Sequence, residues 1–232
     1  PRQLLGHGYS VEVFRELLAE EQAKGNLSEA TKAAFGYLAI ALDKLRDYNS
    51  RMCRWHVNRG LMVNTFDRHD FSFKWSYAEM APLIVGLGYD WAIQETEKCI
   101  SELIELTHPE LNVKTALKNK DQLGFSKTTG FMPPSTTISC KPGESLDHIA
   151  DATIDIVVMD PPYYDNVMYA ELSDFFYVWL KRTAGYVYPE LFRRPLTDKE
   201  HEAVANPARF RGQKGAKELA YRDYRDRMAA IF

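Results

Sequence analysis

The sequence predicts an α/β protein whose N-terminal part is mostly helical. The run IDIVVMD, at residues 154–160, is hydrophobic apart from Asp155 and its last residue, as expected of a strand covered on both faces in a parallel sheet. From Leu172 to Leu180 the apolar side chains return to helical spacing, so strand, loop and helix form half of an α/β unit. The β-branched run TTISC, at residues 136–140, predicts a second strand.

The residues before this unit predict a helical hairpin and a third helix. Apolar side chains recur at helical spacing from Val11 until Gly25, which is a stop signal. Ser28 is suited to cap a second helix, which runs to about Tyr48. Another apolar stripe lies within residues 91–104, and the last residues, KELAYRDYRDRMAAIF, predict a final helix.

These patterns divide the chain into three parts. Residues 1–110 form the mostly helical part, which we interpret as an insertion. Residues 111–135 have the Lys, Thr, Gly and Pro content of a loop or linker. Residues 136–232 contain the predicted strands and the helix that follows them.

Arginine alternates with aromatic residues between residues 46 and 75. Guanidinium groups bind phosphates and aromatic rings stack on unpaired bases, so the segment predicts contacts with nucleic acid. Arg51, Arg54 and Trp55 are the candidate residues. A solvated face over a small aromatic cluster explains the same pattern equally well.

The composition narrows the class of protein. A hydrophobic content of 45% and a net charge of −3 are ordinary for a globular protein and argue against non-specific coating of nucleic acid. Cys53, Cys99 and Cys140 are far apart and form no C-x-x-C pair, so neither a disulfide framework nor a metal site is expected. No run is long and apolar enough to span a membrane. We therefore expect a cytoplasmic protein with no membrane partner.

The predicted strand at residues 154–160 ends in Asp160, Pro161, Pro162 and Tyr163. In open parallel sheets, ligands bind beyond the C-terminal ends of the strands. The two prolines stiffen the segment and donate no backbone hydrogen bonds, which leaves a carboxylate and a carbonyl oxygen beside an aromatic ring. This combination suits a planar heterocycle with an exocyclic amine. Two structural alternatives are a turn that merely ends the strand and a P-P-x-Y ligand for a WW domain.

The string DPPY resembles the fourth motif of the S-adenosylmethionine-dependent amino-methyltransferases that modify adenine N6. The longer string DPPYYDNVMYAELSDFFYVWLKR is similar to the prokaryotic adenine-specific DNA methylases that often carry a zinc ribbon. The strings LRDYNSRMCRW and NTFDRHDFSFKWSYAE resemble the same branch. The resemblance implies a Rossmann-like methyltransferase sheet, S-adenosylmethionine as cofactor and DNA as partner.

The resemblance also implies roles for individual residues. Asp160, with the carbonyl of Pro161, would hold the amine of a flipped adenine, and Tyr163 would stack on the base. Pro162 completes the rigid turn. The remaining candidates are Glu144, Ser145 and Asp160 for the cofactor, and Tyr164, Asn166 and Tyr169 for the substrate; Tyr164 and Asn166 are equally suited to cap the following helix.

One departure from the family concerns the glycine-rich cofactor loop. Gly86 and Gly88 lie in VGLGYDW, but Pro82 interrupts the run before them, so the match is poor. We therefore expect the loop upstream of Pro1 and further sheet strands downstream of Phe232, so that the chain alone would be inactive. Cytosine N4 or RNA methylation, and a non-catalytic module that binds nucleic acid, are the alternative functions.

Overall fold

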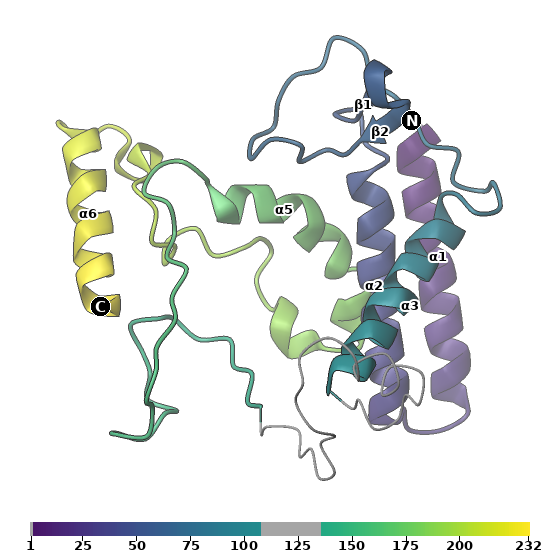
Figure 1. Cartoon of the computed structure of the whole chain (residues 1–232), viewed down its shortest axis with the longest axis horizontal. Helices are drawn as coiled ribbons and strands as arrows, with labels where there is room; N and C mark the ends of the chain where they lie inside the picture. The colour runs from purple at the N-terminus through teal and green to yellow at the C-terminus, as the bar shows by residue number, and fades with distance from the viewer. Residues whose placement is uncertain (1, 108–135) are drawn as a thin grey trace, which may run out of the picture.

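The computed structural model describes residues 2–107 and 136–232 of the 232-residue chain. The described part is mainly helical and contains one small antiparallel sheet (Figure 1). The helices and strands are α1 (Arg2–Ala23), α2 (Glu29–Asp47), β1 (Arg54–His56), β2 (Leu61–Val63), α3 (Tyr89–Thr107), α5 (Tyr169–Leu180) and α6 (Ala216–Ile231). Short 3-10 helices are η1 (Val57–Arg59), η3 (Ala184–Tyr186), η4 (Pro189–Phe192) and η5 (Pro207–Phe210).

Helices α1 and α2 form the predicted hairpin. The side chain of Ser28 accepts a hydrogen bond of 3.0 Å from the backbone N–H of Thr31, which confirms its role as the cap of α2. Gly25, in the connection between the two helices, has a φ of +135°, which residues other than glycine rarely adopt. The rings of Phe14 and Phe35 meet edge to face at 5.3 Å between the two helices. Their contact anchors the main hydrophobic cluster.

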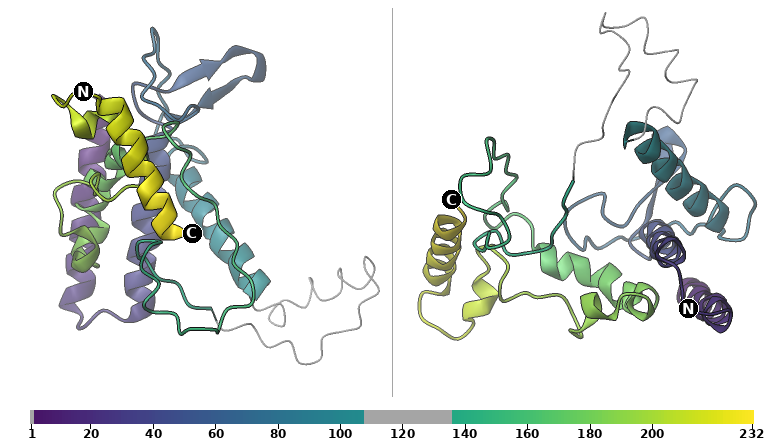
Figure 2. Two further views of the ribbon diagram at one scale, coloured as in Figure 1. Left: turned by 90° about the vertical axis from the view of Figure 1, so that its left-hand side faces the viewer. Right: turned by 90° about the horizontal axis from the view of Figure 1, so that it is seen from below.

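Helix α2 is the central element of the described residues. Helix α3 packs on it from one direction and α5 from another, while α6 lies at the far end of the molecule from α1 (Figures 1 and 2). Ala184, which follows α5, joins the cluster of Phe14, Phe35 and Leu42. The cluster therefore combines residues from both ends of the sequence.

A buried arginine joins α2 to α5. Arg46 is only 1% exposed, and its guanidinium lies 4.7 Å from the centre of the Trp179 ring. Its charge is paired with Asp43, one turn earlier in α2. His7, from α1, approaches the backbone oxygen of Asn49 at 3.1 Å and lies edge-on to the same Trp179 ring.

The two strands of the small sheet form a hairpin. Arg54 pairs with Val63, and His56 pairs with Leu61. The connection ends at Gly60, whose φ of +61° gives the left-handed turn that closes the hairpin. The segment of alternating arginine and aromatic residues therefore contains a short β-hairpin.

The structure corrects both predicted strands of the parallel sheet. Residues 136–140 and 154–160 form no regular secondary structure and pair with no other segment among the described residues. Ile156, Val157 and Val158 are 79%, 71% and 91% exposed. A central strand is buried only when neighbouring strands and helices cover it, and the described residues supply none of these. The predicted linker, 111–135, lies outside the described residues.

None of the described helices combines the length and the apolar character that crossing a membrane requires.

The buried pair of Asp43 and Arg46 predicts a pH-dependent stability. Burial raises the pKa of Asp43 from 3.8 to about 7, with Arg46 opposing the shift. The folded state therefore binds this proton more tightly than the unfolded state does. The stabilisation from Asp43 is complete below pH 4 and is lost as the pH rises to about 7.

We expect Asp43→Asn to remove this dependence. The free energy of unfolding of the wild type, minus that of the variant, should fall by more than about 1 kcal/mol between pH 4 and pH 7. Denaturant titrations of both proteins at several pH values measure this difference. Burial lowers the pKa of His7, which has the opposite effect on stability, but His7 is present in both proteins. If the difference in unfolding free energy between the two proteins stayed constant with pH, the raised pKa of Asp43 would be contradicted.

Candidate functional site

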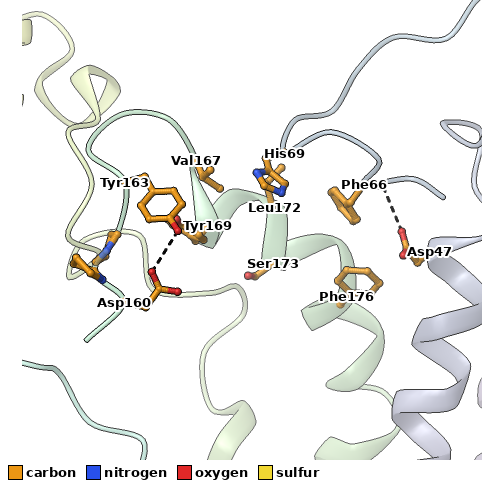
Figure 3. Close-up of a pocket in the computed structure, with 12 residues that line it drawn as sticks. Asp47, Phe66, His69, Asp160, Tyr163, Val167, Tyr169, Leu172, Ser173 and Phe176 are labelled. Carbon is orange, nitrogen blue, oxygen red and sulfur yellow. Dashed lines mark hydrogen bonds between the residues drawn. The ribbon is translucent and has the colours of Figure 1, made fainter. Parts of the chain in front are cut away.

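A cavity of about 610 Å³ lies between the Asp160–Tyr163 segment and the helical region (Figure 3). One side is formed by the Asp160–Tyr163 segment itself. Helix α5 forms the floor, and residues from the end of α2 and from the loop after β2 form the other side. Segments more than 80 residues apart in the sequence therefore share one cavity.

Asp160 and Tyr163 face the cavity together. The Tyr163 hydroxyl donates a hydrogen bond of 3.3 Å to a carboxylate oxygen of Asp160 (Figure 3). The negative charge of Asp160 raises the pKa of Tyr163, because ionised Tyr163 would be repelled by the carboxylate. Both side chains are exposed, so an external ligand can reach them.

Several hydrogen bonds fix the segment around the two prolines. The carbonyl of Pro162 accepts hydrogen bonds from the Tyr224 hydroxyl, at 3.0 Å, and from the backbone N–H of Tyr164, at 3.1 Å. The backbone N–H of Asn166 donates to the Tyr163 carbonyl at 2.8 Å. Helix α6, which carries Tyr224, thus holds the turn in place.

Helix α5 presents one face to the cavity. Tyr169, Leu172, Ser173 and Phe176 have the spacing i, i+3, i+4 and i+7, which places them along one side of a helix. The start of α5 is tied to the C-terminal region, because the backbone N–H of Ala170 donates to Glu202 at 2.9 Å. The same helix ends beside the core of the α1–α2 hairpin.

Asp47 organises the side of the cavity opposite Tyr163. Its carboxylate accepts hydrogen bonds from the Asn64 side chain, at 2.9 Å, and from the backbone N–H of Phe66, at 3.4 Å (Figure 3). Its backbone oxygen accepts from the N–H of Thr65 at 2.7 Å. The end of α2 therefore fixes the loop that brings Phe66 and His69 to the cavity.

The structure brings some of the predicted site residues together. Asp160, Pro161, Pro162 and Tyr163 all line the cavity, and so does Tyr169, predicted as a substrate contact. These five residues line the cavity at and before the start of α5.

The other substrate candidates have different positions. The Tyr164 ring packs edge-on against Tyr224 at 5.2 Å, and its φ of +41° marks the tight turn. Arg54 pairs with Asp67 at 2.9 Å, and Arg51 lies over the Tyr77 ring at 5.6 Å. Trp55, on β1, and Asn166 are exposed. None of these five candidates lines the cavity.

The cofactor candidates Glu144 and Ser145 also lie outside the cavity lining. Ser145 is in a tight turn, where its backbone N–H donates to the Pro142 carbonyl at 3.0 Å. Gly86 and Gly88 lie in the turn before α3, and a Cβ at Gly88 would come within 2.2 Å of the Pro82 oxygen. No strand leads into this turn, so the described residues show no glycine loop of the expected kind.

Sequence reasoning missed Asp47, Phe66, His69 and Ser173 as cavity residues. The helical spacing of residues 169–176 could have identified Ser173, since it shares a face with Tyr169. No local pattern in the sequence links Asp47 or His69 to the Asp160 segment, because tertiary packing creates that contact.

Two further findings concern metal binding and similarity to known proteins. Among the residues that the structure describes, no group of three or more His, Cys, Asp or Glu side chains could hold a metal ion. Comparison of the chain with protein-family models, curated proteins and solved structures finds no match. Functional assignment therefore depends on the residues and the geometry of the cavity.

The role of Asp47 is testable by Asp47→Ala. Removing the carboxylate leaves the Phe66 N–H without its acceptor and should lower the free energy of unfolding by about 1–3 kcal/mol. Hydrogen exchange at the Phe66 amide should also become faster. Mass spectrometry of deuterium uptake in residues 64–66 measures this change. Glu16→Ala, on the exposed face of α1, is the control. Equal hydrogen exchange at the Phe66 amide in the two variants would contradict the role of Asp47.

Proposed function

We propose that this chain contributes the amine-binding site of an S-adenosylmethionine-dependent DNA methyltransferase that modifies adenine N6. The observation that carries the proposal is the pair of Asp160 and Tyr163, an acceptor and an aromatic ring that line one open cavity. The resemblance of the DPPY string to adenine amino-methyltransferases supports the same assignment.

The geometry fits a flipped adenine in the following way. Asp160 accepts an N–H of the exocyclic amine, and Tyr163 offers its ring to the base. A carboxylate accepts several hydrogen bonds, so the amine can share Asp160 with the Tyr163 hydroxyl. Holding the amine in a fixed orientation directs its lone pair to a methyl donor, and such positioning supplies a large part of the rate in transfer reactions. Flipping brings N6 out of the base stack, where it can be approached.

The described residues do not fit S-adenosylmethionine. Glu144 and Ser145 are outside the cavity, and the glycines of the α3 turn do not line it. We therefore assign only amine binding to this chain and propose that other segments of the methyltransferase domain hold the cofactor. The exposed apolar side chains at 156–158 support this proposal, because neighbouring strands of a Rossmann-like sheet would cover them.

A second candidate is a module that binds nucleic acid without transferring a methyl group. The lack of a cofactor site among the described residues favours it. It would use the same contacts with Asp160 and Tyr163, so the two candidates differ in product rather than in binding. Cytosine N4 and RNA amines also fit the acceptor and the ring, and a cytoplasmic location is consistent with each candidate.

Asp160→Ala tests the proposed chemistry in the complete protein. Loss of the acceptor should reduce transfer of a labelled methyl group to DNA at least about 100-fold, the usual effect of removing one preorganised polar group at a reacting centre. The neighbouring Asp165→Ala, a carboxylate that does not line the cavity, should keep the activity of the wild type. Undiminished transfer by Asp160→Ala would exclude the proposed role.

The product identifies the substrate. Nuclease digestion of DNA treated with the complete protein and labelled cofactor should release N6-methyladenosine as its deoxynucleoside, which chromatography separates from N4-methylcytidine. Release of the N4-methylcytosine nucleoside instead would show that cytosine, and not adenine, is the target base. Binding of DNA without any labelled product would favour the second candidate.

A further inference from the structure

The cavity is larger than one base requires. Its volume of about 610 Å³ lies within the range of roughly 300–1,000 Å³ that encloses drug-sized ligands. Asp160 and Tyr163 occupy one end, and Phe66 and His69 line the cavity from the other side of α5 (Figure 3). A base held at Asp160 therefore leaves the part beside Phe66 for another group.

Phe66 is a rigid platform. Its ring contacts Phe71, Phe175 and Phe176, with ring centres 5.7, 5.2 and 5.5 Å apart. Its backbone is fixed by Asp47. A ring that is already immobilised loses little entropy when a planar group packs against it, so it suits a second aromatic ligand.

The polar groups at this end suit a base better than a phosphate. Asp47 places a carboxylate in the lining, and Asp160 places another at the opposite end, so an anion inside the cavity would be repelled. The exposed imidazole of His69 offers ring nitrogens that can hydrogen-bond to a base edge.

We infer that Phe66 and His69 bind the base next to the target adenine and so set the preference for the flanking nucleotide. This inference rests on the proposed function, because a neighbouring base enters the cavity only when the target base is held at Asp160. Contacts with flanking nucleotides commonly set the sequence context of enzymes that act on extruded bases.

A double-mutant cycle between protein and DNA tests the inference. The complete protein is titrated with fluorescent single-stranded oligonucleotides that contain one adenine, with a normal base or an abasic site on its 5′ or 3′ side. Base stacking on an aromatic side chain contributes about 1–3 kcal/mol. The abasic site on one side should therefore weaken binding to the wild type at least about 5-fold.

The same abasic site should weaken binding to Phe66→Leu less than 2-fold, because the platform for the flanking base is already lost. Phe71→Leu, which removes a ring that packs on Phe66 but does not line the cavity, should keep the 5-fold loss. His69→Ala changes an exposed side chain and should reduce the discrimination among the four flanking bases without unfolding the protein. Equal abasic losses in wild type and Phe66→Leu on both sides would overturn the inference.

A parallel cycle separates this result from a failure of the proposed function. Purine, which lacks the exocyclic amine, replaces the target adenine, and Asp160→Ala replaces Phe66→Leu. If removal of the amine weakens binding to the wild type but not to Asp160→Ala, the assignment of the amine site is supported. In that case, equal abasic losses in the wild type and Phe66→Leu overturn only the inference about the flanking base. If the amine makes no difference to either protein, both assignments fail.

Discussion

The contact between Arg46 and Trp179 is the interaction on which the rest of the site depends. A fully buried guanidinium is costly unless polar groups satisfy it, and here Asp43 accepts a hydrogen bond from it while the Trp179 ring covers one face. The contact joins α2, from the N-terminal region, to α5, which follows the Asp160 segment. Together with the packing of Phe66 on Phe175 and Phe176 of α5, it sets the position of the cavity floor relative to Asp47 and Phe66.

The cavity follows from this junction in two steps. Arg46 holds the end of α2 against α5, and the next residue, Asp47, fixes the loop that carries Phe66. At the other end, Tyr224 from α6 holds the Pro162 carbonyl, so that Asp160 and Tyr163 face the same space. The Phe66 ring and the Asp160 carboxylate are thus positioned by separate elements that meet only through packing.

The sequence predicted those features that local physics determines. Helical spacing gave the α1–α2 hairpin, α3, α5 and α6, and Ser28 caps α2 because its hydroxyl replaces a missing backbone acceptor. The clustering of Asp160 and Tyr163 was also predictable, since two prolines between them restrict the chain. The prediction of strands at 136–140 and 154–160 was wrong for the described residues, because an apolar run becomes a strand only where a neighbouring strand pairs with it. Arg54, a candidate for contacts with nucleic acid, forms an ion pair with Asp67 that no local pattern in the sequence reveals.

The central claim is that Asp160 and Tyr163 hold an exocyclic amine. A crystal structure of the complete protein with a short DNA strand containing one adenine tests it most directly. We expect the N6 atom within about 3.2 Å of an Asp160 carboxylate oxygen, with the base against the Tyr163 ring. An ordered DNA strand whose adenine lies outside this cavity, or whose amine faces away from Asp160, would contradict it.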